Sequence, residues 1–253
     1  MERKRRIAIR DRLLKIGSDK GLREELGKYD AYGVIKDVNM YPLHFLFGVI
    51  FDYHIQYKMA WRAPYELEER LRGRKIPFDA ESIASMDERE LTQIIRIEPS
   101  LHRYPSRVSN ALIEAAKLVV TKYNSDPSNI WNDKPTAKQL ESRFDEFKLI
   151  GQKKASIAVR ILVDWFNIPI SGNKSSIDIS VDRHVIRVLK RLSLIDEQEP
   201  DKAIQAAREL NPEYPGALDF PAWAIGERWC KPKEPECGSC RIGDICPKAL
   251  MMN

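Results

Sequence analysis

The chain has 253 residues, enough for one or two domains with a buried core. Lys and Arg number 42 against 37 Asp and Glu, so the formal net charge is +5, which is compatible with a polyanionic partner but does not require one. A hydrophobic fraction of 43% excludes a disordered chain, and no apolar run approaches the roughly 18 residues of a membrane span. The N-terminus is charged where a signal peptide is apolar, so we expect a cytoplasmic protein, nucleoid-associated if the source is prokaryotic.

Apolar residues recur at helical spacing along most of the chain. The clearest stripes predict helices over 108–123, 153–166 and 185–192. Weaker patterns predict further helices at 43–58, 64–72, 87–97 and 201–210. Strand-like alternation is lacking, so the sequence predicts an all-α protein of two helical lobes, with the loop 168–180 crossing between them.

Four cysteines stand within the last 24 residues and none precedes them. They have the spacing Cys-x6-Cys-x2-Cys-x5-Cys, at Cys230, Cys237, Cys240 and Cys246. Such close thiols in a chain without an export signal indicate ligands of one metal centre rather than disulfides. Outer ligands six and five residues from one central pair favour a [4Fe–4S] cluster over zinc, which stays the alternative. The cations Lys231, Lys233 and Arg241 either offset the charge of the cluster or contact phosphates.

A second group of residues surrounds Gly151, which we interpret as part of a hairpin that leads into a helix. Gly151 can adopt the backbone angles of a tight turn. The helix start after it, with Gln152 and Lys154, presents free N–H groups to an anion. Lys153 is partly shielded by the helix that it opens and could act as a nucleophile, although a solvated lysine is the commoner explanation.

The third group is the stretch Val181-Asp182-Arg183-His184-Val185-Ile186-Arg187-Val188. Asp182 directly precedes an apolar-periodic helix, as an N-cap does. A half-buried capping carboxylate can also serve as a general base or as a counter-charge to a developing cation. His184 and Arg187 are candidate phosphate contacts or ordinary surface residues.

Taken in order, the three groups resemble the helix-hairpin-helix (HhH-GPD) DNA glycosylase superfamily, in its endonuclease III-like branch. The resemblance covers roughly residues 42–248 and is sharp from Gly151 onward. It implies a six-helix barrel with the helix-hairpin-helix at 42–167. A second lobe from both termini, at 1–41 and 168–253, would hold the cluster, with DNA in the cleft between the lobes.

The resemblance also implies roles for individual residues. Lys153 matches the Schiff-base lysine, and Asp182 matches the aspartate that assists attack and stabilises the sugar cation. The four cysteines match the cluster ligands, and 147–152 the phosphate anchor. The implied activity is excision of a flipped, damaged base from double-stranded DNA, with AP-lyase activity through the lysine, by a monomer. A glycosylase without strand cleavage, a non-catalytic DNA-binding module and a zinc-stabilised adaptor are the alternatives.

The sequence departs from the family in the hairpin and in the barrel region, and the segment between Lys153 and Asp182, with the loop 171–180, is longer than expected of the family. Lys148 and Leu149 replace the usual Pro and Gly of the hairpin, and a Leu resists the turn that a Gly allows. The barrel region is the more divergent, so the target base cannot be carried over. The candidates for a base pocket are Asp52, His54 and Gln56, and those for a wedge that enters the base stack are His102, Arg103 and Tyr104. The basic N-terminus Arg3-Lys4-Arg5-Arg6 either extends the DNA footprint or is a solvated helix face.

Overall fold

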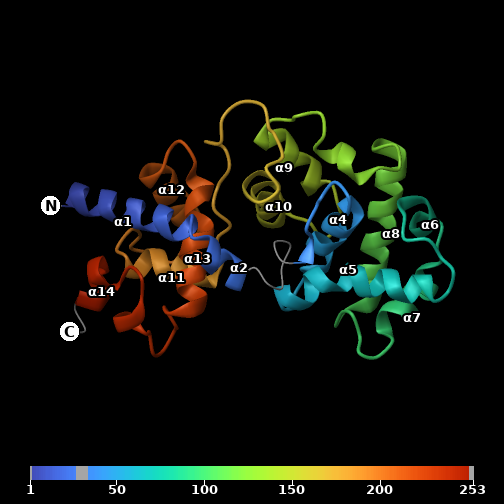
Figure 1. Ribbon diagram of the computed structural model, residues 1–253, viewed down its shortest axis with the longest axis horizontal. Helices are drawn as coiled ribbons and strands as arrows, with labels where there is room; N and C mark the ends of the chain where they lie inside the picture. The colour runs from blue at the N-terminus through green and yellow to red at the C-terminus, as the bar shows by residue number, and fades with distance from the viewer. Residues whose placement is uncertain (1, 27–33, 251–253) are drawn as a thin grey trace. The chain divides into compact units, whose positions relative to one another are not determined.

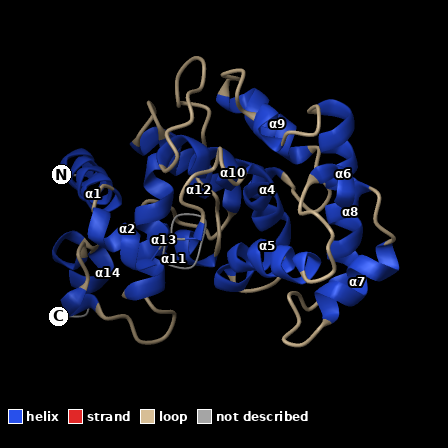
Figure 2. Ribbon diagram, turned by 45° about the vertical axis from the view of Figure 1, so that its right-hand side comes forward, coloured by secondary structure: helices blue, strands red, loops and turns tan. Residues whose placement is uncertain are grey.

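A computed structural model of the chain describes residues 2–26 and 34–250; residues 1, 27–33 and 251–253 lie outside it. The described residues form helices joined by loops and turns, without a named strand (Figure 2), which confirms the all-α prediction. Each helix in those ranges is too short or too polar to cross a membrane.

The chain divides into two compact units, one of which contains both chain ends (Figure 1). Unit 1 comprises residues 1–26 and 172–253, and unit 2 comprises residues 27–171. The domain boundaries predicted at residues 42 and 167 stay a prediction. The predicted terminal range 1–41 includes residues outside the described part of the chain.

Unit 2 contains helices α4 to α10 and a short 3-10 helix. Their bounds are α4 Pro42–Phe51, α5 Tyr57–Arg72, α6 Ala80–Ala84, α7 Glu88–Arg96, α8 Pro105–Lys122, η2 Pro127–Ile130, α9 Ala137–Asp145 and α10 Gln152–Asp164. Helix α4 is buried on all sides, as its almost entirely apolar sequence requires. Its Phe45 ring meets Trp131 and Phe144 edge-on, at centroid distances of 5.8 and 6.1 Å. Helix α4 is therefore the centre of this unit.

A glycine allows α4 and α5 to approach closely. A Cβ atom at Gly48 would lie 2.3 Å from the Trp61 ring, so this position admits only hydrogen. Helix α5 begins at Tyr57, well before the predicted start at 64, and carries Pro64 in its interior. The helix accommodates this proline beyond its second turn, although a proline in a helix interior removes one backbone hydrogen bond.

The predicted helix 43–58 is wrong beyond Phe51. The N–H of Asp52 donates to Gly48 O at 3.1 Å and closes the last turn of α4. The chain then bends sharply, because the N–H of Tyr53 donates to Phe51 O and His54 has a positive φ of 55°. This break exposes the polar segment between α4 and α5, which apolar periodicity alone does not reveal.

Unit 1 combines the N-terminal helices with the C-terminal third of the chain. The bounds are α1 Glu2–Gly17, α2 Lys20–Leu26, α11 Arg183–Arg191, α12 Pro200–Leu210, η3 Pro215–Leu218, α13 Asp219–Arg228, η4 Cys237–Ser239, η5 Gly243–Ile245 and α14 Pro247–Leu250. Helices α11 and α13 cross at Gly226, where a Cβ atom would lie 2.6 Å from His184 Cβ. This close crossing joins α11, whose N-cap is Asp182, to α13, which ends at Arg228, two residues before the first cysteine.

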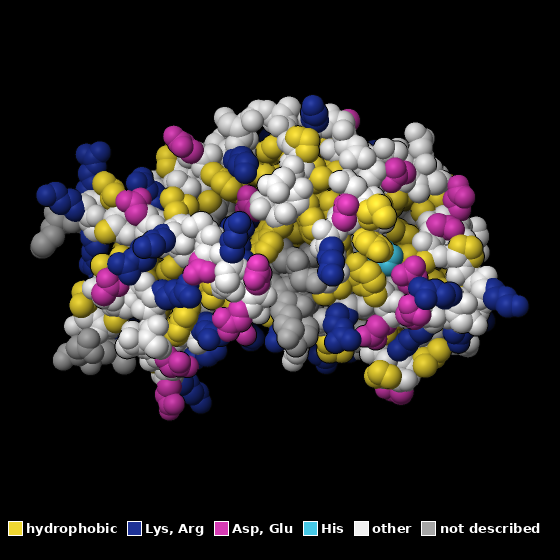
Figure 3. Space-filling view, in the orientation of Figure 1, with side chains coloured by type: hydrophobic (Ala, Val, Ile, Leu, Met, Phe, Trp, Pro, Cys, Tyr) yellow, Lys and Arg dark blue, Asp and Glu magenta, His cyan; other side chains and the backbone are white. Residues whose placement is uncertain are grey.

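The N-terminal basic residues lie on α1. Arg3, Lys4 and Arg5 are exposed, whereas Ile9 and Leu13 face the core of unit 1. Lys and Arg side chains gather around this end of the molecule in Figure 3. The exposed basic face agrees with the solvated-helix interpretation and leaves a DNA contact as a prediction.

Candidate functional site

The hairpin before α10 forms its turn at Leu149 and not at Gly151. Leu149 has a positive φ of 66°, and the Ile150 N–H donates to Phe147 O at 2.9 Å to close the turn. The side chains of Phe147 and Ile150 are buried and anchor it. The expectation that Gly151 supplies the turn is therefore wrong, because its φ of −101° is open to any residue. The leucine takes a strained position that a glycine would adopt without strain.

Helix α10 begins without a side-chain cap. Gly151 occupies the N-cap position, and it has no side chain that could accept the free N–H groups of the first turn. Gly151, Gln152 and Lys153 are exposed, so these N–H groups and the positive end of the helix dipole can meet an anion. This start has the chemistry of a phosphate-binding site, with the exposed amine of Lys153 in its first turn.

Lys154 differs from the prediction that it contacts DNA, because its side chain turns inward. Its Nζ donates to Val49 O at 2.6 Å and to Ile50 O at 3.3 Å, two carbonyls at the C-terminal end of α4. Burial lowers the pKa of the Lys154 ammonium to about 8, although the charge of Asp52 raises it. The two successive lysines of α10 thus have different surroundings: Lys153 is exposed to solvent, and Lys154 packs against α4.

Asp182 is the N-cap of α11, as predicted. Its Oδ1 accepts the N–H groups of both His184 and Val185, each at 2.8 Å. The residue is half-buried and the cap fixes its orientation. Because both bonds end on Oδ1, the lone pairs of Oδ2 are left for another group.

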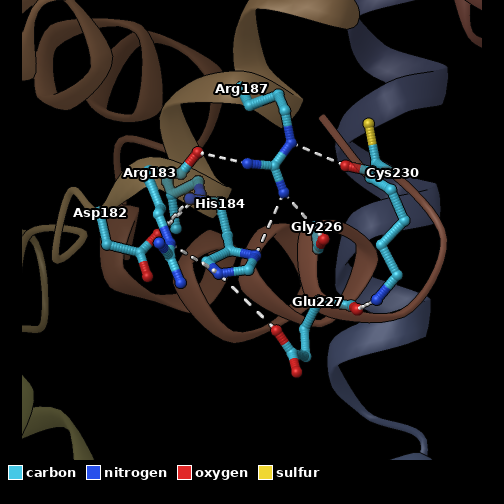
Figure 4. A network of polar contacts seen from close by, with 9 residues as sticks. Asp182, Arg183, His184, Arg187, Gly226, Glu227 and Cys230 are labelled. Atoms are coloured by element: carbon cyan, nitrogen blue, oxygen red, sulfur yellow. Dashed lines mark hydrogen bonds and ion pairs between the residues drawn. The ribbon is translucent and has the colours of Figure 1, made fainter. Parts of the chain in front are cut away.

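Figure 4 shows that Arg187 fastens α11 to the end of α13. Its guanidinium donates to Cys230 O at 2.7 Å, to Gly226 O at 2.9 Å and to Arg183 O at 3.0 Å. The nitrogen that donates to Gly226 O, Nη2, also lies 3.2 Å from Nδ1 of His184. These internal bonds engage the side chain that we had considered for a phosphate contact, so its contact with DNA stays a prediction.

The sequence did not single out Arg191, one helical turn beyond Arg187. Its guanidinium donates to the Cys230 sulfur at 3.1 Å and to the carbonyls of Lys231 and Pro232 at 2.7 and 2.8 Å. The Cys246 thiol lies 3.6 Å from Arg191 O. The only sequence signal for this role is the spacing, since arginines four residues apart share one helix face.

The four cysteines line one cavity of unit 1. Apolar side chains, Val188, Leu192, Ile225 and Ile242 among them, complete its wall. Burial raises the pKa of the Cys240 thiol to about 11, the Ile242 N–H opposes this, and the charges of the other three cysteines add to it. The predicted ligands therefore come together.

The residues at this cavity fit a [4Fe–4S] cluster. Within residues 2–26 and 34–250, no three His, Cys, Asp or Glu side chains form a preformed metal site, and this includes the four cysteines. The cavity wall carries all four thiols and no other His, Cys, Asp or Glu. Four thiolates in an apolar wall are the ligand set of such clusters.

Two further contacts support the cysteine loop. Arg12 of α1 donates to Arg241 O at 2.7 Å and to both carboxylate oxygens of Asp244 at 2.8 and 2.9 Å. At Gly243 a Cβ atom would lie 2.4 Å from Cys237 O, so the loop closes only with a glycine there. Of the loop lysines predicted to contact DNA, Lys231 donates to Glu227 O, whereas Lys233 is exposed.

The candidate pocket and wedge residues have different surroundings. The side chains of His54 and Gln56 are exposed, and that of Asp52 is half-buried at the end of α4. Tyr104 is 41% exposed, with the exposed Arg103 guanidinium 5.1 Å from its ring centroid. These five positions keep their predicted roles as predictions.

His102 has a structural position that conflicts with a wedge role. It is 1% exposed, its Nε2 lies 2.9 Å from Tyr53 O and its Nδ1 accepts the Tyr104 N–H at 3.0 Å. A buried ring with both nitrogens engaged cannot enter a base stack without breaking these bonds. Its physical role is to tie the segment before α8 to the end of α4.

Solved structures of DNA glycosylases share this fold. A trapped endonuclease III–DNA covalent intermediate is similar at a TM-score of 0.64 and 19% identity, over 98% of each chain. A thermostable thymine-DNA glycosylase is similar at a TM-score of 0.62 and 16% identity, over 99% of each chain.

Two curated relatives match parts of the sequence. Endonuclease III of Thermotoga maritima is 25% identical over 138 residues, which are 53% of this chain and 54% of that protein. The chloroplastic endonuclease III homolog 2 of Arabidopsis thaliana is 31% identical over 80 residues, 28% of this chain and 21% of that protein. The matches thus span about half of the first relative and a fifth of the second. The family model of the HhH-GPD superfamily base excision DNA repair proteins matches residues 48–213, about two thirds of the sequence, and the chain belongs to this family.

Proposed function

We propose that the protein is a DNA glycosylase that excises a damaged base and then cleaves the strand as an AP lyase. The observation that carries the proposal is the exposed Lys153 in the first turn of the uncapped helix α10. That helix start offers N–H groups to a phosphate and an amine to the adjoining sugar. Membership of the base excision repair family supports the same reaction class.

The reaction assigns complementary tasks to two residues. The neutral amine of Lys153 attacks the sugar C1′ while the C1′–N bond breaks and its electron pair leaves with the base. Positive charge develops on the sugar, and the carboxylate of Asp182 stabilises it more in the transition state than in the ground state. The attached nitrogen then loses a proton and forms a double bond to C1′, while the C1′–O4′ bond opens with its electron pair on O4′, which takes up a proton. The resulting iminium acidifies the C2′ proton, and its loss expels the 3′ phosphate, which breaks the strand on the 3′ side.

Contacts with DNA are proposed at the exposed helix start. Gly151 and Gln152 offer backbone N–H groups to one phosphate, and the amine of Lys153 lies beside them in sequence. His184, Arg187 and Lys231 are bonded within unit 1, so the exposed Lys233 is the stronger candidate among the predicted contacts of that unit.

We infer that Cys230, Cys237, Cys240 and Cys246 hold a [4Fe–4S] cluster. The support is their common cavity and the arginine bonds to Cys230. When bound, such a cluster supplies a cross-link among four points of the loop. Arg187 and Arg191 hold that loop against α11, the helix that begins at Asp182.

A panel of duplexes tests the proposal. Each duplex carries one altered base or an abasic site, and products of anaerobically purified protein are resolved with and without hot alkali. We expect base release on at least one lesion, strand cleavage without alkali, and an adduct trapped by borohydride. Base release that needs alkali for cleavage would indicate a glycosylase without lyase activity, and binding without release across the panel would contradict the proposal.

Lys153→Ala should abolish the trapped adduct because it removes the attacking amine. Lys138→Ala is the matched control, since Lys138 is also exposed in the first turn of a helix of unit 2, α9. An adduct that persists in Lys153→Ala would overturn the lysine assignment. A loss in both variants would point to a general effect of charge on DNA binding.

A further inference from the structure

The residues that lead into Asp182 are buried, although they end the loop 171–180 that makes this region longer than expected of the family. Residues 177–180, which we call the tether, are each no more than 8% exposed. The tether is not part of a helix or a strand, so its buried backbone groups need partners elsewhere in unit 1. These partners indicate what the extra length of chain does.

Two contacts fasten the first half of the tether. The N–H of Gly216 donates to Ile177 O at 2.8 Å. A Cβ atom at Gly216 would lie 2.9 Å from Ile177 Cγ2 and 3.0 Å from Ile177 O, so the two segments are in close contact. Arg208 of α12 donates to both carboxylate oxygens of Asp178, at 2.8 and 2.6 Å. This paired geometry fixes the orientation of both side chains.

Asp219 holds the other end of the tether. It lies in the first turn of α13, is 3% exposed, and its Oδ2 accepts the N–H of Ser180. The positive end of the helix dipole stabilises a carboxylate at that place, and a charged acceptor makes a stronger hydrogen bond than a neutral one. Helix α13 therefore fixes the backbone two residues before Asp182, the N-cap of α11.

We propose that Asp219 is a positioning residue that presets the carboxylate of Asp182 for the sugar. This inference rests on the proposed function, in which Asp182 stabilises the positive charge of the sugar. The N–H groups of His184 and Val185 hold Asp182 from the side of α11, and the bond at Ser180 holds the chain from the other side. Because a misplacement of about 1 Å can cost about 100-fold in rate, the second anchor matters for base release.

The test compares single-turnover base release with DNA binding, on a lesion that the unaltered protein excises. Asp219→Ala removes the acceptor of the Ser180 N–H and should slow base release about 10-fold, less than the cost of a full displacement. Affinity for an abasic-site duplex should stay unchanged, because the Asp219 side chain is buried. Asp219→Asn keeps an acceptor oxygen and should recover most of the rate. Asp126→Ala, which removes the acceptor of the Ser128 N–H in unit 2, is the control.

A double-mutant cycle shows whether Asp219 acts through Asp182. Asp182→Asn keeps a capping side chain but lacks the charge, so its exact placement matters little for the sugar cation. Adding Asp219→Ala to Asp182→Asn should therefore lower the rate of base release only slightly further. A second loss of about 10-fold would mean that the two residues act independently, and it would overturn the inference.

Gly216→Ala perturbs the tether at its other end and replaces Asp219→Ala if that variant does not fold. Its methyl group must displace Ile177, which should slow base release. This loss should also nearly vanish in combination with Asp182→Asn. Gly73→Ala is the control, because a Cβ atom there lies 3.6 Å from its nearest neighbour and displaces nothing.

The outcomes separate this inference from the proposed function. If the unaltered protein releases no base from any lesion of the panel, the proposed function fails and this inference falls with it. If it releases base and Asp219→Ala does so at the same rate, only the inference fails. A loss of DNA affinity that accounts for the whole loss of rate would show a general structural role and would also overturn the inference.

Discussion

The helices α10 and α11 begin in opposite ways, and the two residues assigned to catalysis lie at these beginnings. Helix α10 starts at a glycine without a side-chain cap and exposes Lys153 in its first turn. Helix α11 starts at Asp182, whose Oδ1 accepts two backbone N–H groups. One start leaves its N–H groups for an external anion, and the other satisfies them internally.

Under the proposed function, the two kinds of helix start suit two different chemical tasks. An uncapped start suits the phosphate of a ligand, because the positive end of the helix dipole is not neutralised. A capped start suits a carboxylate that must stay in place, because two bonds of 2.8 Å fix its orientation. The following changes remove or exchange one of these properties, or remove a contact that supports the cysteine loop.

The largest effect is expected for Asp182→Asn. Asparagine also caps helices, so the melting temperature should change little while the negative charge is lost. Without that charge the sugar cation is less stabilised, and single-turnover base release should fall at least about 100-fold. Base release near the rate of the unaltered protein would show that the carboxylate has only its capping role.

The second largest effect is expected at Arg191, which supports the cysteine loop from the C-terminal end of α11. Arg191→Leu removes the bonds to the Cys230 sulfur and to two loop carbonyls. Because loss of a supporting contact costs about 10- to 100-fold in metal affinity, iron per chain and visible absorbance should drop after dialysis against a chelator. Arg6→Leu, which breaks an exposed ion pair with Glu209, is the control and should keep its iron.

Gly151→Asp converts the start of α10 into the type found at α11. A Cβ atom at Gly151 meets nothing within 4 Å, so the aspartate fits and caps the free N–H groups. The helix should gain a few tenths of a kcal/mol in stability. DNA binding should weaken roughly threefold to tenfold, with a smaller salt dependence, because the new charge repels phosphate.

Gly151→Ala controls for the added volume, since it brings a methyl group without charge. Its DNA affinity should stay close to that of the unaltered protein. Equal affinities for Gly151→Asp and Gly151→Ala would mean that phosphate does not bind at the start of α10.

The smallest effect is expected for Arg12→Ala, at the contact between α1 and the cysteine loop. The hydrogen bond from Arg12 lowers the pKa of Asp244, so this pair stabilises the fold above the ordinary pKa of an aspartate. The contribution is lost as the pH falls through the lowered pKa of the folded state. Melting temperatures should therefore differ slightly at pH 7 and converge in acid, whereas a difference that grows in acid would contradict the assigned pair.

The all-α class and the order of the reactive residues were predictable, because both depend on local pattern. The cap at Asp182 follows from an aspartate before an apolar-periodic helix, and helix α12 begins and ends within one residue of its prediction. The break of α4 at Asp52 was not predictable in this way. The apolar residues after it, Tyr53, Ile55 and Tyr57, alternate with polar ones. This spacing argues against a continuing helix but does not locate the turn, which arises from backbone bonds at Asp52 and Tyr53.

Contacts between residues far apart in the sequence could not be predicted either. Arg12 bonds a residue 232 positions away, and Arg187 bonds one 43 positions away. A single sequence carries no signal for such pairs, because many arginines and acceptors would serve equally well on composition alone. The inward turn of Lys154 is of the same kind, since its partners at the end of α4 lie 105 and 104 residues earlier.

The most direct test of the central assignment is to locate the attachment point of the trapped adduct. The unaltered protein is reduced with borohydride on abasic duplex DNA, digested, and its cross-linked peptide is sequenced by mass spectrometry. We predict that the sugar remnant is attached to Lys153. Attachment to Lys154, or to any lysine outside α10, would contradict the assignment.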